Sequence, residues 1–110
     1  MNDFKLELKA ILLRHEGEAR AIPGRELAAM FNLRDDRRVR LAIRELIADG
    51  LPVAANTEKP AGYFIVATRQ EAERYAGSIR NRLIKDAIRR RDFRRAADLY
   101  LTPAEQGRLI

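Results

Sequence analysis

Arginine is the residue type in this sequence whose number and spacing best suggest a chemical role. Two clusters stand out, which comprise Arg37, Arg38, Arg40 and Arg44, and then Arg89, Arg90, Arg91, Arg94 and Arg95. A guanidinium stays charged at all physiological pH values, and it can donate paired hydrogen bonds to a phosphate or to the edge of guanine. Two such clusters indicate an acidic partner, of which nucleic acid is a common example.

The positive charge is unevenly distributed along the 110 residues. Of the net charge of +6, residues 1–67 hold little, because they contain eleven Lys and Arg against ten Asp and Glu. Residues 68–98 contain ten basic residues against five acidic ones. This excess fits binding to a polyanion. The alternative, which the sequence leaves open, is an arginine-rich helix that is simply solvated.

The composition argues against catalysis. The sequence has no cysteine and only one histidine, His15, so we find no cluster of metal-ligating residues. It also offers no plausible nucleophile–base pair and no phosphate-binding glycine loop. We therefore expect a protein that is not an enzyme and that needs no cofactor and no metal.

The sequence also lacks the signals expected of a membrane or secreted protein. Its first residues contain no apolar signal segment, and no apolar run approaches the roughly 20 residues that span a bilayer. The absence of cysteine fits a reducing compartment. We expect a cytoplasmic protein with no membrane partner.

The first arginine cluster is predicted to lie on an amphipathic helix, residues 36–49. Apolar residues at helical spacing define its buried face, which comprises Val39, Ala42, Ile43, Leu46 and Ile47. The opposite face comprises Arg37, Leu41, Arg44 and Ala48, flanked by Arg38 and Arg40. Asp35 or Asp36 is expected to cap the start of this helix, and Gly50 is expected to end it in a left-handed conformation.

Shorter elements are expected around that helix. Residues 3–15 and 25–31 have helical periodicity, with His15 in a last turn and Asn32 as a left-handed turn residue. Residues 51–55 and 63–67 have the composition of two strands joined by a polar tip, 56–61. Residues 21–22 are expected to form a minimal strand beside them.

The second arginine cluster is predicted to lie on a long helix that ends near Asp98. Thr68 followed by Glu71 is typical of a capping box, which marks the start of a helix. Tyr75, Ile79 and Leu83 fall on an apolar stripe. That stripe is either part of the core or the seam of a homodimer formed through this C-terminal helix.

Several segments of the sequence, taken in order, resemble a known family. The segments GRELAAMFNL, Val39-x3-Ile43-x2-Leu46-x3-Gly50, Leu51-Pro52-Val53 and Gly62-Tyr63-Phe64 together are similar to the winged helix-turn-helix DNA-binding domain of the biotin repressor. The similarity covers roughly residues 8–66. More loosely, a short winged helix with a basic C-terminal helix is similar to small phage or prophage DNA-binding proteins.

The resemblance implies that helix 36–49 enters the major groove while the hairpin touches the adjacent backbone. The implied recognition residues are Arg37, Arg38, Arg40, Leu41 and Arg44. Lys59, at the tip of the hairpin, is the implied phosphate contact. The sequence departs from the family by placing two acids, Asp35 and Asp36, where Ser-Arg is frequent. Those acids would repel phosphate unless they cap the helix or pair with its arginines.

Together these observations predict an α+β, mainly α protein, namely a winged helix-turn-helix of three helices and a β-hairpin followed by a long helix. The predicted parts are a domain at 1–67, a basic helix at 68–98, and a short helical turn and tail at 99–110. The expected function is sequence-specific binding of double-stranded DNA, as a transcription regulator or a phage replication or regulatory factor, in a bacterial or phage-infected cell. The alternatives are a protein-interaction module without specific DNA binding and, more weakly, RNA binding.

Overall fold

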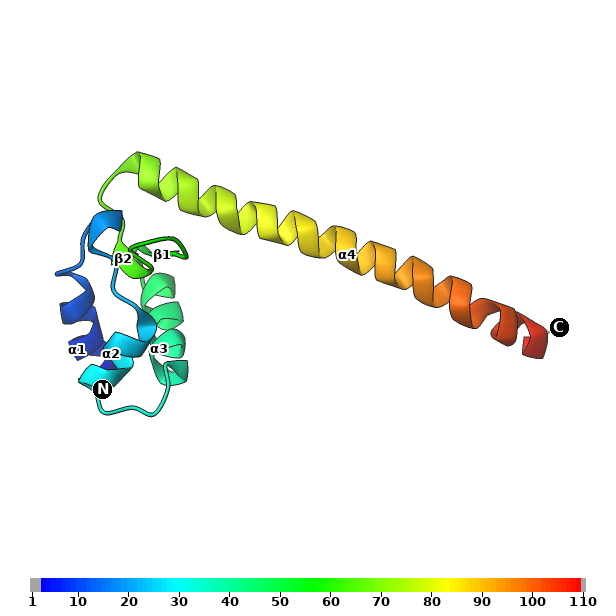
Figure 1. The fold of residues 1–110 in the computed structure, drawn as a ribbon, viewed down its shortest axis with the longest axis horizontal. Helices are drawn as coiled ribbons and strands as arrows, with labels where there is room; N and C mark the ends of the chain where they lie inside the picture. Colours follow the sequence, from blue (N-terminus) through cyan, green and yellow to red (C-terminus); the bar gives the residue numbers. More distant parts are fainter. Residues whose placement is uncertain (1–2, 110) are drawn as a thin grey trace. The chain divides into compact units, whose positions relative to one another are not determined.

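The structure, a computed structural model, describes residues 3–109 and the side chains of residues 3–101. In chain order, the elements are α1 (Asp3–Leu12), the 3₁₀ turn η1 (Glu18–Arg20), α2 (Gly24–Met30), α3 (Arg37–Ala48), β1 (Val53–Asn56), β2 (Gly62–Ile65) and α4 (Arg69–Leu109) (Figure 1). The predicted mainly helical α+β class is confirmed. The chain divides into two compact units after Tyr75, and each unit is described by itself.

The first unit is built around side chains from α1, α2 and α3. Leu8, Leu12, Leu27 and Val39 are its largest fully buried side chains. On α3, the buried residues are Val39, Ala42, Ile43 and Leu46, as the helical periodicity predicts. Ile47 was also expected on this face, but it is 45% exposed. Ile47 is exposed because it lies about 90° around the helix axis from the middle of the buried face.

The two strands form an antiparallel hairpin whose register runs from Val53 opposite Ile65 to Asn56 opposite Gly62. They are offset from the predicted 51–55 and 63–67. The amide of Leu51 donates instead to the carbonyl of Leu46, closing the end of α3. The amide of Ala67 donates to the Glu71 carboxylate. Leu51 and Ala67 therefore lie outside the hairpin ladder.

The segment between α1 and α2 adds backbone pairing to β2. Ile22 and Tyr63 exchange two hydrogen bonds of 2.9 and 2.8 Å, which confirms the expected pairing at 21–22. The amide of Ile65 donates to the His15 carbonyl at 2.8 Å. The prediction that His15 lies in a last helical turn was wrong, because α1 ends at Leu12 and His15 pairs with β2 instead.

Among the described residues, Gly17 (φ 91°), Asn32, Gly50 and Gly62 adopt backbone conformations with positive φ. Asn32 (φ 56°) and Gly50 (φ 108°) do so as predicted, and they end α2 and α3 respectively. Gly62 (φ 128°) has a second reason to be glycine. A Cβ atom there would overlap the carbonyl group of Ile22, so the close pairing of residue 22 with the hairpin requires a residue without a side chain.

The second unit consists of the part of α4 that follows Tyr75. The predicted end near Asp98 and the separate helical turn at 99–110 were wrong, because α4 continues through Pro103 to Leu109. Helix formers such as Ala96, Ala97 and Ala104 surround this point, and propagation of a helix needs little once it is nucleated. None of the helices described is long and apolar enough to pass through a lipid bilayer.

The apolar stripe of α4 is not part of the core. Ile79 is 39% exposed and Leu83 is 65% exposed, and neither belongs to the buried cluster. Tyr75 is half-buried at the end of the first unit.

Candidate nucleic-acid interface

The outer face of α3 presents two arginines around an apolar centre. Arg37 and Arg44 lie seven residues apart on the helix, so they project from the same side after two turns. Leu41 lies between them and is 51% exposed. Neither guanidinium forms an ion pair within the part of the chain that the structure describes. We call Arg37, Leu41 and Arg44 the α3 face.

The two acids that precede α3 are occupied by local contacts. Asp35 Oδ1 accepts a 3.1 Å hydrogen bond from the backbone N–H of Arg37, the first residue of α3. Asp36 makes no such bond, and its Oδ1 lies 3.3 Å from Nε of Arg40, one turn later. The sequence left open which aspartate caps. Asp36 holds the N-cap position without a side-chain cap bond, and Asp35 instead satisfies the first free amide of the helix.

The Asp36 carboxylate lies close to Gly24, the first residue of α2, where there is no room for a side chain. A Cβ atom on Gly24 would lie 2.9 Å from Oδ2 of Asp36 and 3.2 Å from the Tyr63 ring. Burial, together with the nearby charge of Asp36, raises the pKa of the Tyr63 phenol. Asp36 is thus packed between α2, the hairpin and Arg40.

The acids in the second half of α3 are paired with α1. Lys5 Nζ lies 2.7 Å from Oδ2 of Asp49 and 3.5 Å from Oε1 of Glu45. The hydrogen bond to Asp49 is the main cause of a raised pKa at Lys5. Glu45 and Asp49 are four residues apart, so one lysine on α1 can reach both carboxylates on the same flank of α3.

Arg38 also projects toward α1. Its guanidinium carbon lies 4.4 Å from the centroid of the Phe4 ring, within the range of a cation–π contact. Phe4 in turn packs edge-to-face on Phe31, with ring centroids 4.7 Å apart. The predicted arginines of α3 therefore divide into Arg37 and Arg44 on the α3 face, Arg40 shared with Asp36, and Arg38 against an aromatic pair.

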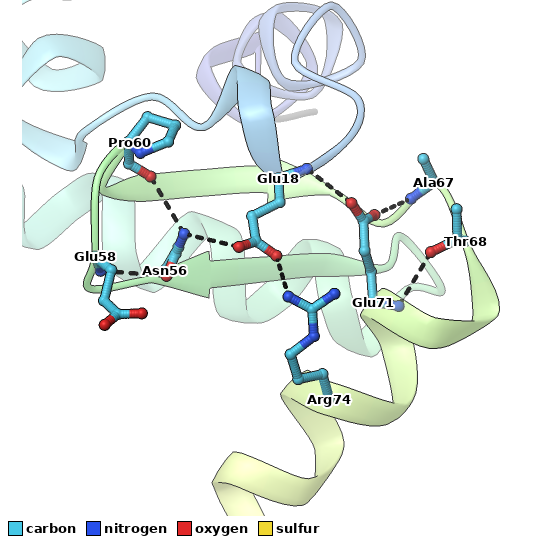
Figure 2. A network of polar contacts seen from close by, with 8 residues as sticks. All are labelled: Glu18, Asn56, Glu58, Pro60, Ala67, Thr68, Glu71 and Arg74. Atoms are coloured by element: carbon cyan, nitrogen blue, oxygen red, sulfur yellow. Dashed lines mark hydrogen bonds and ion pairs between the residues drawn. The ribbon is translucent and has the colours of Figure 1, made fainter.

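The predicted phosphate contact, Lys59, lies in the loop between β1 and β2 and is exposed. Asn56 organises this loop from the end of β1, as Figure 2 shows. Its Oδ1 accepts from the amide of Glu58, and its Nδ2 donates to the Pro60 carbonyl and to Glu18. These contacts hold the ends of the loop around Lys59.

A polar network anchors the first turns of α4 to the first unit (Figure 2). Thr68 Oγ1 accepts from the amide of Glu71 at 3.1 Å, which confirms the predicted cap. The Glu71 carboxylate accepts from the amides of Ala67 and Glu18, at 2.8 and 2.9 Å, and these bonds are the main causes of a lowered pKa at Glu71. Arg74 completes the network through a 2.7 Å ion pair with Glu18.

The second arginine cluster lies on α4 within the second unit, and all five of its side chains are exposed. Two of them pair with acids on the same helix, Arg89 with Asp86 at 3.0 Å and Arg91 with Asp92 at 3.1 Å. Arg90, Arg94 and Arg95 form no ion pair among the side chains that the structure describes. This part of α4 therefore carries a net positive charge, and some of its arginines pair with acids on the same helix.

Among the residues described, no group of His, Cys, Asp and Glu is arranged to hold a metal ion. Comparison of the chain with protein-family models, curated proteins and solved structures finds no match to any of them. Function is therefore inferred from the geometry and charge of the described residues alone.

Proposed function

We propose that this protein binds double-stranded DNA in a sequence-specific manner, as a winged helix-turn-helix. In this proposal α2 and α3 form the helix-turn-helix and the β1–β2 hairpin forms the wing. The order of elements supports the assignment, since two helices joined by a left-handed turn at Asn32 precede a two-stranded hairpin. An α-helix such as α3 fits the major groove, which is about 12 Å wide in B-DNA.

The observation that carries the proposal is the absence of free acid from the α3 face. Each of the four carboxylates that belong to α3 or its ends has a partner. Asp35 accepts from the Arg37 amide and Asp36 pairs with Arg40, both on α3, whereas Glu45 and Asp49 pair with Lys5 of α1. A surface meant for a polyanion requires this arrangement, because an unpaired carboxylate there would repel phosphate. Arg37 and Arg44 are left as the cations of that face.

Each exposed residue then has a distinct role in the proposal. Arg37 and Arg44 contact base edges or phosphates, and Leu41 makes apolar contact with a base such as the thymine methyl group. Arg40 and Arg38, which are held by Asp36 and Phe4, contribute positive charge at the margins. Lys59 contacts a phosphate beside the groove, and the α4 arginines supply contacts without sequence preference.

A titration of the full chain with duplex DNA at two salt concentrations tests the proposal. We expect Arg37→Ala/Arg44→Ala to weaken binding to a preferred sequence, by about 1–3 kcal/mol for each bidentate arginine–guanine pair that is removed. Arg37→Lys/Arg44→Lys is the matched control, because it keeps the charge but removes the paired donors. This lysine variant should still bind a duplex of random sequence, but it should lose its preference for one sequence over another. Failure of the full chain to bind any duplex at low salt would contradict the proposal.

One observation favours a second candidate, a protein-interaction module. Exposed apolar side chains recur along α4 in the second unit, among them Leu83, Phe93 and Tyr100. Isolated apolar residues on a surface are ordinary, but a repeating set on one helix is typical of assembly. The same titration separates the candidates, because an interaction module shows no preference among duplex sequences. Tighter binding to an RNA duplex or single strand than to DNA would instead favour RNA binding.

A further inference from the structure

Six apolar residues of α4 in the second unit fall at the alternating spacings of three and four of a seven-residue repeat. They are Ala76, Ile79, Leu83, Phe93, Ala97 and Tyr100, while the exposed Ile84, Ile88, Leu99 and Leu101 lie off this repeat. Two charged residues, Asp86 and Arg90, fill the two places of the repeat that lie between Leu83 and Phe93. Alternating spacings of three and four place all eight residues along one seam of the helix.

The seam is complementary to itself when it is reversed. A two-fold axis that crosses α4 at residue 88 relates position 83 to position 93 of a second copy, and position 79 to position 97. Under this operation Leu83 meets Phe93, Ile79 meets Ala97, and Ala76 meets Tyr100. Each of the last two pairs matches a large side chain with a small one, which is how packed helices fill space evenly.

The charged centre of the seam obeys the same symmetry. The two-fold axis places Asp86 of one copy opposite Arg90 of the other, twice. In the single chain, Asp86 is paired with the exposed Arg89, at 3.0 Å, so it can exchange that partner at little cost. A polar pair within an apolar seam is known to fix register and orientation in coiled coils.

We propose that α4 pairs with α4 of a second copy of this chain as an antiparallel two-stranded coil centred on residue 88. This pairing goes beyond the proposed DNA binding and does not depend on it. The two-fold axis makes the contact isologous, so it closes as a dimer rather than continuing as a filament. Tyr75 and the rest of the first unit lie outside the paired segment, 76–100.

A parallel pair with the helices in register is disfavoured by the same residues. It would place Asp86 against Asp86 and Arg90 against Arg90 within the seam, where like charges repel. It would also bring Phe93 against Phe93 and Ala97 against Ala97, which leaves the packing uneven. A different face is no better, because the apolar pair Ile84 and Ile88 is followed by Arg91 and Arg95 one turn later.

The flanks of the antiparallel pair predict an unusual response to salt. Arg80 would lie near Arg94 of the second copy, and the two copies of Arg89 would approach each other. Screening weakens such repulsion between exposed charges. Dimerisation should therefore strengthen as salt is added, whereas binding to DNA weakens with salt.

Spin-label distances in the full-length chain test the proposal directly. The sequence has no cysteine, so single substitutions Asn81→Cys, Ile88→Cys and Arg95→Cys each give one label on the side of α4 away from the seam. An antiparallel pair centred on residue 88 predicts the shortest of the three distances for position 88, where the labels are separated only by the width of the pair. It adds an axial offset of about 21 Å for positions 81 and 95, from a rise of 1.5 Å per residue.

Every outcome of this experiment is informative. Three similar distances would mean a parallel pair, and no distance between chains in high salt would mean no pair, so either result overturns the proposal. A charge test supplies the control for folding. Asp86→Arg and Arg90→Asp chains should each fail to dimerise alone and should form a mixed dimer on combination, at helical content equal to the wild type. Mixing without association would count against the pairing of Asp86 with Arg90.

Discussion

Lys5 on α1 lies with its Nζ 2.7 Å from Oδ2 of Asp49, the residue that ends α3. This contact spans two helices that pack together in the first unit. It turns the last acid of α3 toward α1 and away from Arg37, Leu41 and Arg44. The charge of the α3 face therefore depends on a residue that is not part of that face.

Loss of Lys5 is expected to weaken DNA binding more than loss of another lysine on the same helix. Lys5→Gln leaves Asp49 and Glu45 without their cation, which makes the flank of α3 negative. Lys9→Gln is the matched control, because Lys9 is exposed on α1 and forms no ion pair with either of these acids. Titration of each variant with one duplex at fixed salt measures the two losses of DNA affinity. Equal losses would show that only total charge matters.

Shortening a core leucine of α2 is expected to destabilise the first unit strongly. Leu27 is fully buried among side chains of α1 and α3. Leu27→Ala should cost about 2–5 kcal/mol of unfolding free energy, because it leaves a cavity. Leu41→Ala on the exposed face should change it by about 0.5 kcal/mol or less. Urea unfolding measures both, and a small effect at Leu27 would contradict the observed packing.

Two glycines are expected to respond to alanine in opposite directions. Gly62→Ala should destabilise the hairpin, because φ is 128° and the new methyl group would overlap the Ile22 carbonyl. Gly77→Ala should stabilise α4 by about 1 kcal/mol, since a Cβ atom there meets nothing within 4 Å. Thermal melts followed by circular dichroism would show the two shifts. A stabilised Gly62→Ala protein would refute the close approach.

The anchoring of α4 is expected to weaken in acid. Hydrogen bonds from the amides of Ala67 and Glu18 lower the pKa of Glu71. A lowered folded pKa means that the stabilisation is present above the ordinary pKa of glutamate and is lost as the pH falls through the folded value. Protection of the amides of Ala67 and Glu18 against hydrogen exchange, relative to their intrinsic rates, should therefore fall in that acidic range.

Substitution separates this effect from general acid unfolding. Glu71→Gln should lower the protection of those two amides at neutral pH and make that protection less dependent on pH. Glu73→Gln, at an exposed position of the same turn of α4, should leave both unchanged. If Glu73→Gln had the same effect, the network around Glu18 would not be the cause.

Local patterns in the sequence were sufficient to predict most of the elements of the first unit. The buried face of α3 follows from its periodicity, and the ends at Asn32 and Gly50 follow from residues that tolerate positive φ. The end of α1 was mispredicted because pairing of His15 with Ile65 joins residues fifty positions apart. No local pattern contains such a contact.

The same distinction applies to the candidate site. The sequence identifies the arginines of α3, but it does not show which of them have partners. The contacts of Lys5 with Asp49 and of Arg38 with Phe4 join α1 to α3, so they depend on packing. The role of Glu18 in holding Glu71 and Arg74 was missed for that reason. Only the cap formed by Thr68 and Glu71 has a local signal.

Selection of preferred sites from a random duplex library, with each variant measured at two salt concentrations, tests the central claim most directly. The proposal predicts that the wild type selects a defined sequence and that Arg37→Ala/Arg44→Ala loses this preference. Arg94→Ala/Arg95→Ala should keep the same preference with a shallower salt dependence, by about one unit of slope for each arginine–phosphate pair that is removed. An unchanged preference after substitution of Arg37 and Arg44 would contradict the proposed role of the α3 face.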